Sequence, residues 1–135
     1  MKILQRQTAL ALAAGCAAYP AAAHHSWSAD YDVSRSTYVS GTLTRVLLRN
    51  PHSALVLNVR TEDGRHERWI VEWGSPQRLR ERGITAQTLR AGDELRVTGN
   101  PHRDADVKSV RALSVRSGSD GGELGVAVLN RTETR

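Results

Sequence analysis

The sequence predicts an all-β domain with a small helical contribution. Three observations carry this prediction. Short segments rich in β-branched and apolar residues recur along the chain, Asn-Pro and Asp-Gly turns separate them, and a Ser-Pro helix start follows the third segment. The resulting order of three strands, a helix and two strands resembles the OB-fold, a five-stranded, partly open barrel. A strand-rich sandwich is the alternative.

The first three strands are predicted to follow one another as hairpins. Residues 37–49 are rich in β-branched and apolar residues and end at an Asn-Pro turn. Residues 53–60 alternate in polarity, as a returning strand with one buried face does. An Asp-Gly turn, a strong hairpin signal, leads to a third strand over 66–73. Its two tryptophans and Val71 share one face.

A short helix and two further strands complete the predicted barrel. Residues 76–82 form the helix, because Ser75 is a favoured N-cap, a proline follows it and a glycine ends the segment. Leu79 is its expected anchor. The fourth strand covers 94–99 and the last roughly 106–116. The expected core consists of Leu43, Leu55, Leu57, Trp69, Val71, Leu95, Val97 and Leu113.

The start of the chain predicts export. Residues 1–23 combine two basic residues, a short apolar core and three small residues, Ala21-Ala22-Ala23, which is the pattern of a cleaved signal peptide. The apolar run is shorter than the ~20 residues that span a bilayer, and no later segment predicts a transmembrane helix. We therefore expect a periplasmic protein. The alternative, lipidation at Cys16, is weaker because Ala13 stands where lipoprotein boxes favour leucine.

The mature chain is expected to hold one domain over 24–116 and a flexible tail over 117–135. The tail is rich in Gly, Ser and charge, and its "LGVAVL" segment offers an edge strand as the alternative. Loss of Lys2 and Arg6 leaves 17 basic against 14 acidic residues, so the net charge falls from +5 to +3. This mild, interspersed charge argues against nucleic acid as a partner.

Four motifs identify relatives of the chain. They are "AHHSW" after the predicted signal, "RNPHS" after the first strand, "VEWGSP" before the helix and "LRAGDELRVTGNPHRD" near the end. Together they resemble a family of small exported bacterial proteins known only as a domain of unknown function. Trp73 stands at the variable place of the third motif, and Arg49 replaces a small polar residue. The resemblance implies no activity.

One tripeptide occurs twice, at positions where an OB-like barrel binds ligands. Asn50-Pro51-His52 and Asn100-Pro101-His102 fall in the two loops that flank the ligand face of such a barrel. Asn50, Asn100, His52 and His102 are therefore candidate ligand or metal contacts. The alternative is ordinary turn chemistry, in which Asn-Pro shapes the loop and histidine has no role.

Two further histidines follow the predicted cleavage site. Cleavage after Ala23 gives His24 a free amine beside its imidazole, whereas cleavage one residue earlier places a histidine second and third in the chain. Both arrangements suit Cu(II), which prefers tetragonal nitrogen sites. His24 and His25 thus complete a predicted copper set with His52 and His102. The alternative is a frayed terminus whose histidines have no function. For His66, at the edge of a hairpin, we likewise expect no function.

The remaining candidates are less specific. Glu72 and Trp73 are possible ligand contacts, although a solvated strand face and core packing are their ordinary explanations. Trp27 is expected to pin the terminal arm to the barrel. Because the sequence carries no catalytic triad, paired-carboxylate spacing or phosphate loop, an enzyme is disfavoured. We expect a periplasmic protein that binds a small ligand, copper above all. The alternative is a metal-free module that binds an envelope protein or a small organic ligand.

Overall fold

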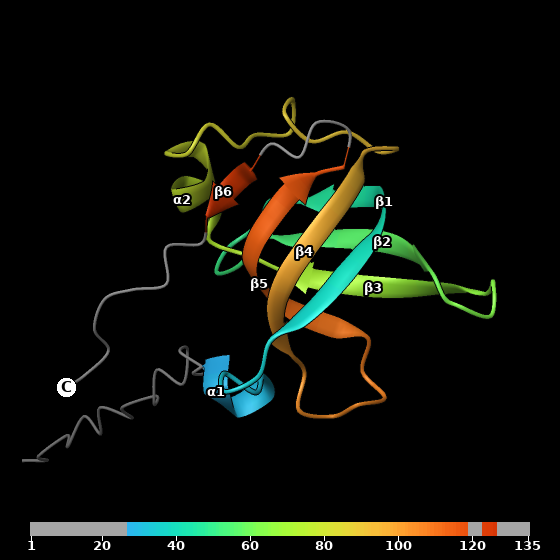
Figure 1. Cartoon of the computed structure of the whole chain (residues 1–135). Helices are drawn as coiled ribbons and strands as arrows, with labels where there is room; N and C mark the ends of the chain where they lie inside the picture. Colours follow the sequence, from blue (N-terminus) through green and yellow to red (C-terminus); the bar gives the residue numbers. More distant parts are fainter. Residues whose placement is uncertain (1–26, 119–122, 127–135) are drawn as a thin grey trace, which may run out of the picture.

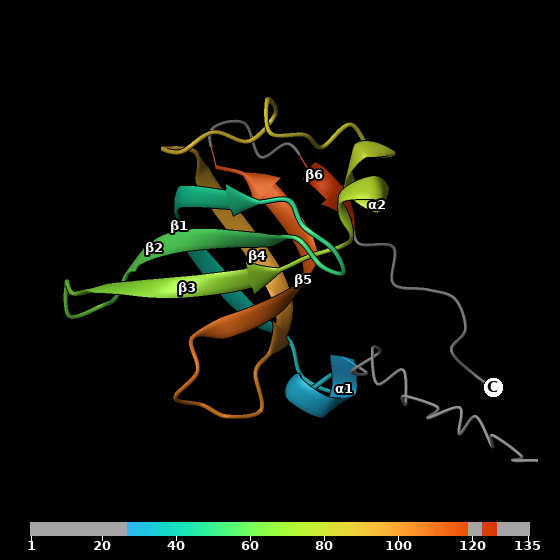
Figure 2. The same cartoon turned by 180° about the vertical axis from the view of Figure 1, so that it is seen from behind.

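A computed structural model of the chain describes residues 27–118 and 123–126. The chain order of its elements confirms the predicted sequence of three strands, a helix and two strands (Figures 1 and 2). A first short helix and a sixth strand are added at the two ends. The elements are α1 (Trp27–Asp30), β1 (Thr37–Leu47), β2 (Ala54–Arg60), β3 (His66–Glu72), α2 (Pro76–Arg80), β4 (Glu94–Pro101), β5 (Ser109–Ser117) and β6 (Glu123–Val126).

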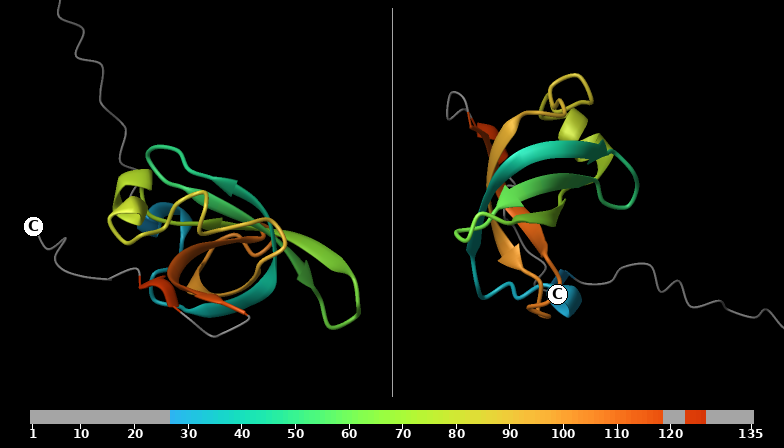
Figure 3. Two further views of the ribbon diagram at one scale, coloured as in Figure 1. Left: turned by 90° about the horizontal axis from the view of Figure 1, so that it is seen from above. Right: turned by 90° about the vertical axis from the view of Figure 1, so that its right-hand side faces the viewer.

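The strands form one sheet that closes on itself. Their order is β3-β2-β1-β4-β5-β6, with antiparallel neighbours throughout. A parallel pairing between β3 and β5 closes the barrel, with Val71 opposite Val110. Figure 3 shows the strands curving around a common axis. The predicted OB-like barrel is therefore confirmed, and the sandwich alternative is wrong.

β1 is the strand that bends the sheet into a barrel. Its first half, from Thr37 to Thr42, pairs with β4, and its second half pairs with β2. Gly41 lies at this crossing, where an added Cβ would come within 2.6 Å of the Asn58 carbonyl oxygen. A glycine is required at this point because the two backbones approach so closely. A bulge between Leu43 and Arg45 follows directly and completes the bend.

The core confirms most of the predicted faces. The buried apolar side chains include Val39, Leu43, Leu55, Leu57, Val71, Trp73, Leu79, Ile84, Leu89, Leu95, Val97, Val110, Ala112 and Val115. Two predicted core residues are only half-buried. Trp69 packs at the margin and donates its indole N–H to Glu67. Leu113 loses its place because a bulge opposite Thr98 and Gly99 turns Ala112 and Val115 inward instead.

The two ends of the described chain add elements that the sequence analysis did not assign. α1 precedes the predicted first strand, and β6 pairs with β5. The four residues of β6 therefore form the edge strand that was the alternative to a flexible tail. The remainder of the tail, 119–122 and 127–135, lies outside the described residues. Within the described ranges, no helix is long and apolar enough to cross a membrane.

Candidate functional site

α1 and the residue that follows it, Tyr31, bring two aromatic rings onto the barrel. Trp27 and Tyr31 are four residues apart, a spacing that places side chains on one face of a helix. Their ring centroids lie 5.8 Å apart. Backbone hydrogen bonds hold the segment in place, from Asp32 N–H to the Pro101 carbonyl at 2.9 Å and from Arg103 N–H to the Asp30 carbonyl at 2.8 Å. The helix is thereby fixed beside the end of β4.

Trp27 contacts two cationic or ionisable side chains. The imidazole of His52, from the loop between β1 and β2, lies 4.0 Å from the indole ring, measured between centroids. The Arg111 guanidinium carbon of β5 lies 4.7 Å from the same ring. Both distances are those of stacking and cation–π contacts. Trp27 therefore contacts the barrel, as its predicted role requires, whereas the arm that precedes it lies outside the described residues.

Tyr31 is buried and hydrogen-bonded. Its side chain is 3% exposed, and its hydroxyl lies 2.8 Å from the Ser109 hydroxyl. Because Ser109 donates its own proton to the Ile70 carbonyl, the Tyr31 hydroxyl is the donor of this pair. The pKa of the Tyr31 phenol is raised to about 12, chiefly by burial and in smaller part by the nearby Glu72 carboxylate, against the lowering by the Ser109 hydrogen bond. The phenol therefore stays neutral at physiological pH.

His102 reaches Tyr31 from directly after β4. The prediction that the second Asn-Pro-His tripeptide lies in a loop is wrong, because Asn100 and Pro101 are the last two residues of β4 and pair with β5. Its ring stands edge-on to Tyr31, with 5.5 Å between centroids. The backbone N–H of Asp104 donates to Nδ1 of His102 at 3.1 Å. In the neutral ring with this hydrogen bond, the proton lies on Nε2. In the other tautomer Nδ1–H donates to the Asp104 carbonyl oxygen, 3.3 Å away, and Nε2 can then accept a ligand.

The repeated tripeptides therefore meet the same structural feature. We define the aromatic-histidine cluster as Trp27, Tyr31, His52, Glu72, His102, Ser109 and Arg111. His52 contacts the ring of Trp27, and His102 contacts the ring of Tyr31. Three predicted site residues, the two histidines and Glu72, thus lie around one short helix. Among the described residues, however, no group of three or more His, Cys, Asp or Glu side chains could hold a metal ion.

The other predicted site residues have different surroundings. Asn100 is buried and donates its side-chain N–H to the Arg35 carbonyl at 2.7 Å, so it ties the end of β4 to the chain before β1. Asn50 is exposed and precedes a cis proline. Trp73 is 2% exposed and belongs to the core. His66 contacts Asn58 on the exposed hairpin. His24 and His25 lie outside the described residues.

Three members of the cluster, Tyr31, Ser109 and Arg111, were missed by sequence reasoning. Ser109 carries no signal, because its place beside Ile70 depends on the pairing of β3 with β5. Tyr31 carries a signal, since an aromatic residue four positions after Trp27 suggests a shared helix face. Arg111 carries none, because its position over Trp27 depends on the β3–β5 closure. The cluster is therefore a product of the barrel topology as much as of the motifs.

Comparison with known proteins gives a family and no function. The model of one family, described as a family of unknown function (DUF6152), matches residues 12–113. The match runs from the predicted signal segment into β5. No curated protein matches the chain. The expected kinship with a family of unknown function is confirmed, and the particular motif set stays a prediction.

Proposed function

We propose that the chain, which belongs to this DUF6152 family of unknown function, is an exported periplasmic protein that binds Cu(II). The site would form where the mature amino terminus meets the aromatic-histidine cluster. One observation carries the proposal: His52 stacks on Trp27, which stands only two residues after His25.

Chain geometry supports a meeting of these histidines. Consecutive Cα atoms are 3.8 Å apart, so the Cα atoms of His25 and Trp27 are separated by at most about 7.6 Å. The indole of Trp27 in turn lies 4.0 Å from the imidazole of His52, between centroids. Side chains near the terminus therefore have His52 within their reach.

The donor count explains why the terminus is needed. The described residues hold no group of three potential ligands, so His52 alone cannot retain an ion. Cleavage after Ala23 would add the amine and imidazole of His24, and cleavage after Ala22 would add amide nitrogens and an imidazole. Cu(II) suits such nitrogen sets best among the common divalent ions. His102 would join through a ring nitrogen, and Glu72 would supply a nearby carboxylate.

The test begins with protein secreted through its own signal and purified from the periplasm. Mass spectrometry reports the cleavage site and any retained metal. Cu(II) titration followed by electron paramagnetic resonance should show a nitrogen-rich tetragonal site with affinity above that for Zn(II). Because imidazole coordinates only when neutral, the affinity for copper should decrease as the pH is lowered below ~6.5, the ordinary pKa of histidine.

Copper affinities of single variants distinguish the proposed ligands from histidines that do not bind the metal. An extra residue before His24 moves the amine away, and His52→Ala removes the loop imidazole; each should weaken copper binding at least tenfold. His66→Ala is the matched control, because that exposed histidine lies on the hairpin. If the extended protein and a His52→Ala, His102→Ala double variant both bind copper like the parent, the proposed site does not exist.

A metal-free interaction module is the second candidate function. It is favoured by the contacts of His52 and His102, which already pack on the rings of Trp27 and Tyr31 respectively. Such contacts would also serve to fix the loop between β1 and β2 and the end of β4 for a protein or small organic partner. Loss of copper binding in a correctly processed, folded protein would support this second function.

A further inference from the structure

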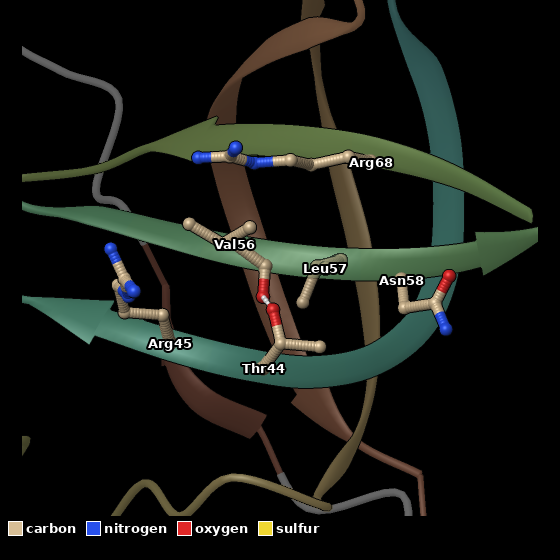
Figure 4. A pocket seen from close by; sticks show the side chains of 6 residues that line it. All are labelled: Thr44, Arg45, Val56, Leu57, Asn58 and Arg68. Carbon is tan, nitrogen blue, oxygen red and sulfur yellow. Dashed lines mark hydrogen bonds between the residues drawn. The ribbon is translucent and has the colours of Figure 1, made fainter.

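A groove lies on the outer surface of the sheet, formed by β1, β2 and β3. It encloses about 350 Å³. Figure 4 shows its lining side chains, which are Thr44, Arg45, Val56, Leu57, Asn58 and Arg68. None of them belongs to the aromatic-histidine cluster. The volume lies at the lower end of the range of small-molecule sites.

Strand register places two arginines on either side of an apolar floor. Arg45 of β1 is opposite Val56 of β2, and Arg68 of β3 is opposite the next outward residue, Asn58. Val56 is 5% exposed, whereas both arginines are exposed. In Figure 4 the two arginine side chains extend toward the end of the face at which β2 begins. A ligand on Val56 would thus have guanidinium groups on both sides.

The bulge in β1 makes this arrangement possible. It turns both Thr44 and Arg45 to the exposed side, where simple alternation would direct one of them inward. The Thr44 hydroxyl donates to the Val56 carbonyl at 3.0 Å, which fixes the bulge against β2 (Figure 4). The position of Arg45 is therefore set by the backbone of the sheet.

The groove carries uncompensated positive charge. Among the described residues, no carboxylate lines it. Within the described part of the chain, neither Arg45 nor Arg68 has a hydrogen bond or ion pair through its guanidinium. At the far end, Asn58 contacts His66 through its amide oxygen, so its NH₂ group is left as a donor. The polar side chains that face the groove therefore either can donate a hydrogen bond to a ligand or are already hydrogen-bonded within the protein.

We propose that this groove binds a small organic molecule that carries an oxyanion, either a carboxylate or a phosphate ester. The planar guanidinium fork matches both groups with paired, charge-assisted hydrogen bonds. The apolar floor at Val56 would take the body of the molecule, so a bare inorganic anion should bind less well. This site is independent of the proposed copper site and shares no residue with it.

The test uses the whole mature protein in the presence of a chelator, so that its outcome does not depend on copper. Benzoate, phenyl phosphate, inorganic phosphate and neutral benzyl alcohol are titrated and followed by ¹H–¹⁵N NMR. We expect saturable shifts at Val56 and Asn58 with the two aromatic anions, and at least tenfold weaker binding of the other two probes. The tighter of the aromatic anions identifies the ligand as carboxylate or phosphate ester.

Arg45→Gln and Arg68→Gln should each weaken the aromatic anion at least fivefold. Arg96→Gln is the matched control, because it removes the same charge from an exposed position on β4. Equal weakening by all three variants would show a general charge effect and overturn the proposal. So would binding that survives both groove substitutions, or the absence of saturable shifts with either aromatic anion. Melting curves establish that each variant is folded.

Discussion

The two helices lie at opposite ends of the barrel and close it by different means (Figures 1 and 2). At the α2 end the closing side chains are apolar: Leu79, Ile84 and Leu89 are each 3% exposed or less. At the α1 end Tyr31 is equally buried but bonds to Ser109 and packs against His102. Apolar burial is non-directional, whereas hydrogen bonds and ring contacts fix orientation. The end with fixed geometry is also the one that carries the predicted ligand residues.

The largest expected effect belongs to the apolar end. Leu79→Ala should lower the free energy of unfolding by about 3 kcal/mol, because it removes a fully buried side chain and leaves a cavity. Chemical denaturation measures this loss. Arg80→Ala, at an exposed position of the same helix, should change stability by less than about 0.5 kcal/mol. A loss below 1 kcal/mol for Leu79→Ala would mean that α2 contributes little to closing the barrel.

The sequence predicted the apolar end better than the polar end. Leu79 was identified as the helix anchor because its N-cap and apolar position are local signals, and both are present in the structure. The Tyr31–Ser109 hydrogen bond joins residues 78 positions apart. It exists because parallel pairing of β3 and β5 brings Ser109 beside Ile70. Neither propensity nor alternation encodes such a pairing.

Irregular strands explain the remaining differences. Alternation placed Leu57 and Val71 correctly, but it fails where a bulge shifts the register, as at Leu113. For the candidate site, the repeated tripeptide located His52 and His102. Of their two aromatic partners, the sequence predicts a contact with the barrel for Trp27 only. It predicts no role for Tyr31. Contacts that depend on barrel closure require the three-dimensional arrangement.

High pH should lower the stability of the protein through the α1 end, where Tyr31 is buried. The pKa of the Tyr31 phenol is raised from 10.0 to about 12, chiefly by burial, so the unfolded chain loses this proton first. Stability is therefore independent of this group below pH 10 and falls as pH rises from 10 to 12, on the order of 2 kcal/mol in total. Denaturation at a series of pH values measures the slope. A Tyr31→Phe protein with the same slope would assign the loss to other groups.

Tyr31→Phe should have a smaller effect at neutral pH. The substitution keeps the ring between Trp27 and His102 and removes only the hydroxyl that donates to Ser109. We expect a loss of about 1 kcal/mol, the usual net contribution of one hydrogen bond. Ser109 retains its bond to the Ile70 carbonyl, which limits the loss. If Tyr31→Phe is as costly as Leu79→Ala, the contrast between the two ends does not hold.

The smallest effect is expected at Ser53, which lies between the two ends at the start of β2. Its backbone is paired twice, because its N–H donates to the Gly74 carbonyl and its carbonyl accepts from the Trp73 N–H. The Ser53 hydroxyl and the Trp73 indole N–H are nevertheless buried without a hydrogen-bond partner among the described residues. An unsatisfied buried hydroxyl lowers stability, so its removal relieves that cost. Ser53→Ala should thus leave stability unchanged or raise it by up to about 1 kcal/mol.

Ser109→Ala is the contrasting variant for this last prediction. Its hydroxyl accepts from Tyr31 and donates to Ile70, so its removal leaves buried groups unpaired and should cost about 1–2 kcal/mol. Thermal and chemical denaturation of the two alanine variants give the comparison directly. A loss above 1 kcal/mol in Ser53→Ala would show that its hydroxyl is hydrogen-bonded in solution. The junction beside Trp73 would then resemble the polar α1 end instead of the apolar α2 end, because a buried polar group stabilises only when it is satisfied.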